Sequence, residues 1–127
     1  MKLIVENKIP HIAPLLAELP VEPLFLSPGA ITRDAISDAE GLIVRTRTRC
    51  DAALLDGTAV RFIATATIGT DHIDLDYCRR RGITVASAPG CNAPAVAQWV
   101  FAALAAVRPD TRTLGIVGCG HVGSIVE

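Results

Sequence analysis

A glycine-rich stretch near residue 120 has the spacing of a phosphate-binding turn. Residues 114–117 form a short apolar run that predicts a buried parallel strand, and the sequence GCGHVG follows it directly. In such a turn the chain would bend sharply away from the strand at Gly118. Gly120 would let a pyrophosphate approach the backbone, and Gly123 would let the next helix pack closely against the strand. The preceding strand is the context that this motif requires, so the stretch predicts dinucleotide binding, with a plain glycine-rich turn as the alternative.

Two residues inside that turn would contribute backbone groups rather than side chains. The N–H groups of His121 and Val122 lie at the expected start of a helix, where free donors and the helix dipole favour a pyrophosphate. We therefore expect the backbone N–H of His121 to matter more than its imidazole ring.

Arginines alternate with threonines after a second apolar run. Residues 41–44 predict a buried strand, and the sequence RTRTR follows at 45–49. If the chain stays extended there, Arg45, Arg47 and Arg49 share one face. Guanidinium groups match the oxygens of a phosphate, so this face could bind a phosphorylated ligand. A solvated strand end is the other interpretation, and it stays open.

A polar loop follows a third apolar run. Residues 60–64 predict a strand, and small polar side chains fill most of residues 65–74. In open α/β sheets ligands bind outside the carboxyl ends of the strands, which is where this loop would lie. His72 adjoins Asp71 in the loop, and a structural hydrogen bond is favoured over catalysis for it, since the backbone easily satisfies a single histidine.

Strands and helices alternate along the chain that must position these groups. Caps are expected at Thr32, Asp51, Asp74 and Asn92. The strands are expected at 2–6, 22–26, 41–44, 60–64 and 83–86; the helices are expected from residue 10 to about 19, and at 33–39, 52–56, 75–81 and 92–107. This alternation predicts the α/β class, with a doubly wound parallel sheet that carries helices on both faces.

Composition excludes several classes of protein. The 127 residues carry a net charge of −1, so no basic excess would recruit nucleic acid or an anionic membrane. No apolar run approaches the roughly 20 residues of a membrane span. No metal site is expected, because the four cysteines show neither C-x-x-C nor zinc-finger spacing. We interpret them as reduced thiols of a cytoplasmic protein.

Three segments resemble a known enzyme family. RFIATATIGTDHID at 61–74, APGCNA at 88–93 and TLGIVGCGHVG at 113–123 are similar to the D-2-hydroxyacid dehydrogenases. Within that family they look like the member that acts in vitamin B6 synthesis, and the first two separate it from phosphoglycerate and lactate dehydrogenases. Residues 6–10 and 42–55 also fit, so the resemblance covers nearly the whole chain in the family's order.

The resemblance implies a fold, a reaction and a cofactor. It implies a flavodoxin-like substrate domain at 1–107, a linker at 108–112, and at 113–127 the first strand and turn of a truncated Rossmann domain that binds NAD. The implied reaction oxidises the 2-hydroxyl of 4-phosphoerythronate, a small phosphorylated sugar acid, to a 2-oxo acid. Thr46 and Thr67 match two substrate contacts of the family, and their hydroxyls can hydrogen-bond an anion. The family also suggests a homodimer.

This sequence departs from the family pattern in places. The segment before residue 113 is several residues short, Gln98 stands where Glu is common, and His121 stands where Asn is usual. The family's catalytic arginine, acid and histidine lie beyond the glycine motif, so no residue of this chain is expected to be catalytic.

Several functions therefore stay open. The chain could be the N-terminal part of such a dehydrogenase and inactive by itself. It could instead be a non-catalytic relic that binds a small anion or dimerises, or a fragment of another D-2-hydroxyacid dehydrogenase.

Overall fold

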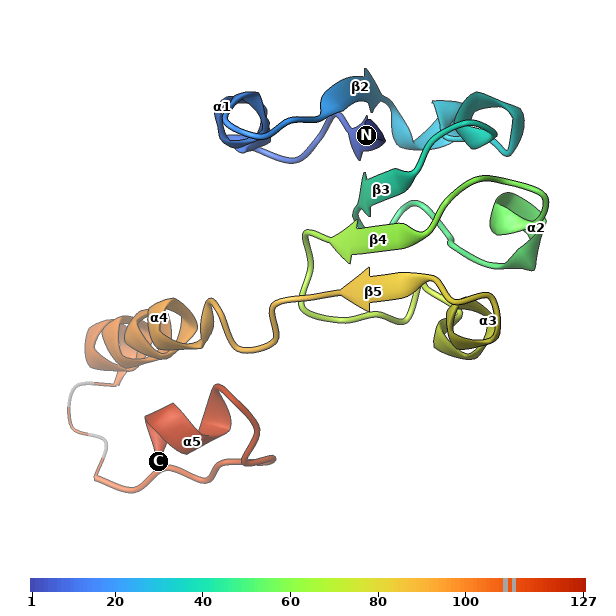
Figure 1. Ribbon diagram of the computed structural model, residues 1–127. Helices are drawn as coiled ribbons and strands as arrows, with labels where there is room; N and C mark the ends of the chain where they lie inside the picture. The colour runs from blue at the N-terminus through green and yellow to red at the C-terminus, as the bar shows by residue number, and fades with distance from the viewer. Residues whose placement is uncertain (109, 111) are drawn as a thin grey trace. The chain divides into compact units, whose positions relative to one another are not determined.

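The computed structural model describes residues 1–108, 110 and 112–127 (Figure 1). They form two compact units, Met1–Ala88 and Pro89–Glu127. The helix expected at 92–107 belongs to the second unit, and the domain boundary expected after residue 107 stays a prediction. Part of the expected linker, residues 109 and 111, lies outside the described residues. In the part of the chain that the structure describes, no helix has the length and apolar character needed to cross a membrane.

The first unit is built on a five-stranded sheet whose neighbouring strands all run parallel. The strand order is β2-β1-β3-β4-β5, which is the flavodoxin-like order. This confirms the predicted α/β class and parallel sheet, with β4 displaced slightly toward the C-terminus. The strands are β1 (Lys2–Glu6), β2 (Glu22–Leu26), β3 (Gly41–Val44), β4 (Phe62–Thr65) and β5 (Thr84–Ala86).

Helices cover both faces of this sheet, as Figure 1 shows. The step from β1 to β2 moves one way across the sheet, and the three later steps move the other way. Because parallel crossovers are right-handed, opposite directions place the connections on opposite faces. Helix α1 (Ile12–Ala17) therefore lies on one face; the connections on the other face contain the 3-10 helices η1 (Pro28–Ala30) and η2 (Asp34–Ile36) and the helices α2 (Ala52–Leu55) and α3 (Leu75–Arg80).

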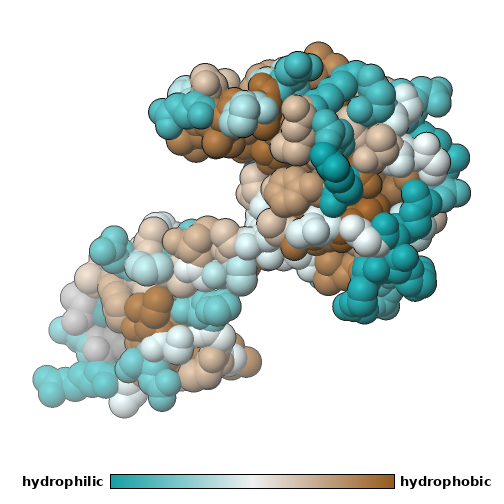
Figure 2. Space-filling view, in the orientation of Figure 1, coloured by the Kyte–Doolittle hydropathy of each residue, from teal (hydrophilic) through white to brown (hydrophobic). Residues whose placement is uncertain are grey.

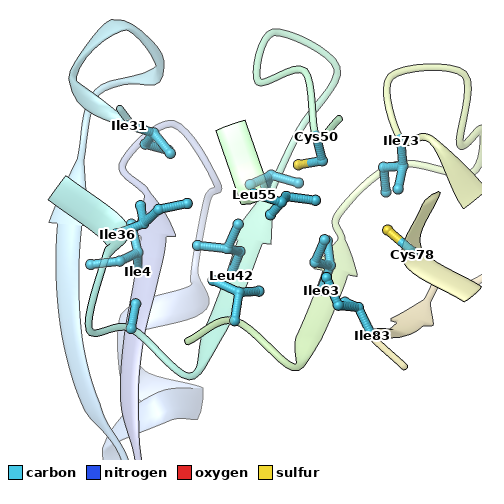
Figure 3. Close-up of a cluster of buried hydrophobic side chains, with 13 residues drawn as sticks. Ile4, Ile31, Ile36, Leu42, Cys50, Leu55, Ile63, Ile73, Cys78 and Ile83 are labelled. Carbon is cyan, nitrogen blue, oxygen red and sulfur yellow. The ribbon is translucent and has the colours of Figure 1, made fainter. Parts of the chain in front are cut away.

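The main core lies between the sheet and the second group of helices (Figure 3). Ile4, Leu42 and Ile63 come from three adjacent strands and are fully buried there. Leu55 of α2 and Cys78 of α3 close over them. A smaller cluster forms between α1 and the opposite face. Burial of these aliphatic side chains fixes the strand register and thereby the level at which each strand ends.

Capping residues in the sequence predicted most of the helix starts. The carboxylates of Asp51 and Asp74 accept hydrogen bonds from N–H groups at the starts of α2 and α3, as predicted. The Thr32 hydroxyl accepts a 3.4 Å bond from the N–H of Ala35, but only the short η2 follows it, in place of the expected helix over 33–39. Asn92 makes no side-chain cap bond, and Pro94 removes one of the two N–H groups that such a cap could use.

The second unit contains α4 (Ala93–Val107) and α5 (Gly123–Val126). The strand predicted at 114–117 is not formed, and Val117 is fully exposed. A parallel strand needs a neighbour to take its backbone hydrogen bonds, and no strand is assigned to the described residues of this unit. The surface of the second unit carries an apolar patch, which is visible in Figure 2. The exposed apolar residues of this unit include Trp99 and Ile116.

Candidate functional site

A cavity of about 370 Å³ opens where β1 and β3 end. Glu6 is the last residue of β1, and Lys8 follows it. Arg45, Thr46 and Arg47 follow β3, which pairs with β1 in parallel. These five residues line the cavity. It therefore lies outside the carboxyl ends of adjacent parallel strands, where ligands bind in open α/β sheets.

The segment after β3 turns instead of staying extended. The N–H of Thr48 donates a 3.1 Å hydrogen bond to the carbonyl of Arg45, which closes a tight turn. The extended chain on which a common face of the three arginines depended is therefore not formed. Arg45 and Arg47 line the cavity, whereas Arg49 pairs with Asp51 at 2.8 Å. Thr48 points into the protein and is buried.

A buried carboxylate holds this turn in place. Glu6 is only 1% exposed, and its Oε2 accepts a 2.9 Å hydrogen bond from the N–H of Arg45. The same oxygen accepts a 3.2 Å bond from the hydroxyl of Thr48. The guanidinium of Arg45 donates a 3.1 Å bond to the carbonyl of Lys8. Together these bonds join the end of β1 to the turn after β3.

The cavity carries an excess of positive charge. Lys8, Arg45 and Arg47 form no ion pair with any residue that the structure describes, whereas Arg49, Arg61, Arg79 and Arg81 each have a carboxylate partner. Three cations against the one carboxylate of Glu6 give the lining a net formal charge of +2 (three minus one). Such a lining attracts an anion, and guanidinium groups suit phosphate or carboxylate oxygens.

A second hydrogen-bonded group lies at the end of β4. The Thr65 hydroxyl is 2.7 Å from the Thr67 hydroxyl and 3.1 Å from Nε2 of His72. Burial lowers the pKa of His72 below its usual value of 6.5, although the charges of Asp71 and Glu6 oppose this shift. His72 is thus a buried, hydrogen-bonded histidine, in agreement with the structural interpretation of this residue. The loop is tied down further by a parallel bridge between Cys50 and Ile73.

The two threonines expected to bind substrate lie in neighbouring loops. Val44 of β3 pairs with Thr65 of β4, and Thr46 and Thr67 each lie two residues further along. Thr46 lines the cavity. The Thr67 hydroxyl bonds to Thr65 and to the carbonyl of Gly69, and it is not among the lining residues.

Glu6 and Lys8 are the cavity residues that the sequence reasoning missed. The available signal was the same one that selected the other loops, a charged residue directly after an apolar run, here at the end of the run 3–5. Applied to the first strand, the carboxyl-end rule would have found both.

The glycine turn in the second unit has two positions that favour or require glycine. Gly118 has a φ of +96°, which side-chain-bearing residues rarely adopt. A Cβ on Gly123 would lie 2.1 Å from the Gly118 carbonyl oxygen, so only glycine fits that contact. A Cβ on Gly120 would meet no atom within 4 Å, so open space lies over the middle of the turn. Pyrophosphate-binding turns use glycines in the same three positions.

The imidazole of His121 lies against another loop of the same unit. A Cβ on Gly90 would lie 3.0 Å from two atoms of this ring, so the ring lies against the loop before α4. The Val122 N–H remains at the start of α5, next to Gly123. Among the described residues, no group of three or more histidine, cysteine, aspartate or glutamate side chains could hold a metal ion.

Sequence comparison relates this chain to a family of dehydrogenases. Residues 4–110 match the family model described as D-isomer specific 2-hydroxyacid dehydrogenase, catalytic domain. The erythronate-4-phosphate dehydrogenase of Bacteroides fragilis is 48% identical over 99% of this chain, and that of Azotobacter vinelandii is 52% identical over 74%. The chain spans 38% of the length of the first relative and 26% of the second.

Solved structures share the fold. The 3-phosphoglycerate dehydrogenase of Entamoeba histolytica, solved with NAD+ bound, is 26% identical, with a TM-score of 0.72 over 99% of this chain and 49% of that one. A protein from Thermus thermophilus is 27% identical, with a TM-score of 0.75 over 99% of this chain and 51% of that one.

Proposed function

This chain belongs to the D-isomer specific 2-hydroxyacid dehydrogenase family, and we propose that it supplies the substrate-binding part of an NAD-dependent oxidoreductase. The proposed substrate is 4-phospho-D-erythronate, whose 2-hydroxyl is oxidised to a 2-oxo acid in the synthesis of pyridoxal phosphate. The identity to erythronate-4-phosphate dehydrogenases supports this choice over other 2-hydroxy acids.

The observation that carries the proposal is the cationic cavity at the ends of β1 and β3. It gathers Lys8, Arg45 and Arg47 without an ion-pair partner among the described residues, and the Thr46 hydroxyl lies beside them. A phosphorylated sugar acid offers anionic oxygens to the cations and hydroxyls to the remaining polar groups. In this proposal Thr46 contacts the substrate directly, and Thr67 contacts it from the neighbouring loop.

The glycine turn is the proposed site for NAD. Gly118 and Gly123 shape the turn, Gly120 leaves room for the pyrophosphate, and the N–H groups of His121 and Val122 would donate to it. When bound, NAD would accept the hydride from the substrate carbon. The NAD+-bound structure of a family relative supports this choice of cofactor. A homodimer and a cytoplasmic location stay predictions.

A titration of the 127-residue chain with 4-phospho-D-erythronate tests the substrate proposal. Backbone amide signals in NMR spectra would report the binding site residue by residue. We expect the largest changes at residues 6–8 and 45–48, with strong weakening at high salt because the attraction is electrostatic. Absence of any change at these residues would reject the cavity as the substrate site.

A non-catalytic anion-binding domain is the second candidate. One observation favours it: the cavity is lined entirely by residues of the unit Met1–Ala88, so anion binding needs no part of the glycine turn. Under this function the chain would bind inorganic phosphate and 4-phospho-D-erythronate with similar affinity, whereas the dehydrogenase proposal requires a preference for the sugar acid.

A further inference from the structure

A carboxylate on the floor of an anion-binding cavity requires an explanation. Glu6 is 1% exposed and lines the cavity together with three cations. Its negative charge opposes the binding of any anion, so a cavity that only collected phosphate would be better without it. The role of Glu6 in holding the turn uses only one of its two oxygens, because Arg45 and Thr48 both donate to Oε2.

The second oxygen of Glu6 has no hydrogen-bond partner among the residues that the structure describes. Oε1 accepts no hydrogen bond from the described residues. No fully buried side-chain oxygen or nitrogen among them lacks a partner, so Oε1 must reach accessible space. Glu6 lines the cavity, so we assign the accessible side of Oε1 to the cavity. A nearly buried acceptor is therefore left open toward the place where the ligand is proposed to bind.

We infer that Glu6 is a specificity-determining residue, whose Oε1 accepts a hydrogen bond from a hydroxyl of a phosphorylated polyhydroxy acid. The inference rests on the proposed function, since it needs the substrate in this cavity. The cations attract any small dianion, and the carboxylate penalises those that bring no hydroxyl donor. Selection thus comes from a group that repels the wrong ligand as well as from groups that attract the right one.

The ligand pair that tests this inference differs only in hydroxyl groups. 4-Phosphobutyrate has the chain length, phosphate and carboxylate of 4-phospho-D-erythronate but no hydroxyl. Hydrogen bonds to charged groups are strong, and an acceptor left unpaired on binding is costly. We expect the full chain to bind the hydroxylated ligand roughly tenfold or more tightly, as measured by NMR titration.

The variant Glu6→Gln keeps the size of the side chain and removes its charge. Its amide oxygen can still accept from Arg45 and Thr48, which leaves an amide that donates toward the cavity. We expect 4-phosphobutyrate to bind to Glu6→Gln more tightly than to the unmodified chain. In this variant the dissociation constants of 4-phosphobutyrate and 4-phospho-D-erythronate should differ by about twofold or less. Glu40→Gln is the matched control: Glu40 pairs with Arg61 and does not line the cavity, so both affinities should be unchanged.

A third variant separates the two roles of Glu6. Thr48→Val removes one donor to Oε2 and leaves Oε1 unaltered. It should loosen the turn and weaken both ligands by similar factors, so that their ratio stays at the value of the unmodified chain.

The outcomes distinguish this inference from the function on which it rests. Equal binding of both ligands by the unmodified chain would overturn the inference and leave the cavity as the substrate site. An unchanged ratio in Glu6→Gln would also overturn it. Binding of neither ligand would reject the proposed function and the inference together. The comparison of the two ligands on the unmodified chain needs no variant, so it stands even if Glu6→Gln fails to fold.

Discussion

The backbone N–H of Arg45 donates a 2.9 Å hydrogen bond to Oε2 of Glu6, although 39 positions separate the two residues in the sequence. The last residue of β1 therefore determines the course of the chain after β3. This bond turns Arg45 and Arg47 toward one cavity and directs Thr48 into the protein. The proposed anion site and the turn after β3 thus share one side chain, Glu6.

Removing one cavity cation should weaken anion binding. Arg47→Gln is expected to raise the dissociation constant for 4-phospho-D-erythronate roughly tenfold, because a charge-assisted contact with phosphate is lost. Arg49→Gln is the control, since Arg49 pairs with Asp51 and does not line the cavity. NMR titrations of both variants measure the difference. Equal effects of the two substitutions would show that only the overall charge matters.

His72 should make the stability of the protein depend on pH. Burial lowers its pKa in the folded state below 6.5, so as pH falls through 6.5 the unfolded state takes up the proton first and is stabilised. The free energy of unfolding should therefore fall between 6.5 and the lower folded-state pKa, with a slope of at most about 1.4 kcal/mol per pH unit. Urea unfolding of the unmodified chain and of His72→Gln at several pH values measures this part of the slope. A slope that is identical in both proteins would contradict the prediction.

The cysteines should divide into two classes of reactivity. Burial raises the pKa of Cys50 to about 12 and also raises that of Cys78. Cys91 and Cys119 are exposed. With a thiol reagent at neutral pH, the exposed pair should react at once and the buried pair only after denaturant is added. Mass spectrometry of the labelled peptides identifies the residues, and rapid labelling of Cys50 in the folded protein would be inconsistent with this core.

Two glycines of the turn should respond differently to the same substitution. Gly123→Ala places a Cβ 2.1 Å from the Gly118 carbonyl oxygen, so the turn must open at a cost of about 1–3 kcal/mol. Gly120→Ala meets open space and should leave the free chain unchanged. The amide signal of Ser124, whose N–H bonds to Gly120, reports the state of the turn. Disruption by Gly120→Ala would mean that the turn is packed more closely than the structure shows.

The 127-residue chain by itself should not oxidise 4-phospho-D-erythronate. Hydride transfer needs a base at the hydroxyl proton and a cation at the carboxylate, both held close to the nicotinamide. His72 is buried and bonded to Thr65, and the described residues of the second unit contain no strand to support the glycine turn. Assays of NADH formation and calorimetric titration with NAD should show no turnover and very weak binding. Turnover at an ordinary rate, about 1 s⁻¹ or more, would show that this chain contains the catalytic groups.

Features set by neighbouring residues could be predicted from the sequence. The apolar runs located the strands of the sheet, and Asp51 and Asp74 marked helix starts because a cap bonds to N–H groups only a few positions away. The parallel sheet followed from the regular alternation of strands and helices. The position of Thr46 beyond the carboxyl end of a strand could be predicted because it follows an apolar run.

Features that depend on distant residues could not be predicted in this way. The alternation in RTRTR is typical of an extended strand, but Glu6 captures the Arg45 N–H and the chain turns. The apolar run at 114–117 is typical of a buried strand, but a strand also needs a neighbour, and hydropathy does not show whether one is available. The cavity unites residues of two loops, so it emerged only from the strand order.

The bridge between Cys50 and Ile73 affects how fast the cavity can be filled. It is an isolated parallel bridge between the loops that follow β3 and β4, made by 2.8 Å bonds from the Cys50 N–H to the His72 carbonyl and from the Asp74 N–H to the Cys50 carbonyl. The bridge therefore joins the two loops to each other in the free chain. For the proposed anion we therefore expect no slow closing motion on this side, and an association rate set by the encounter between the charged partners.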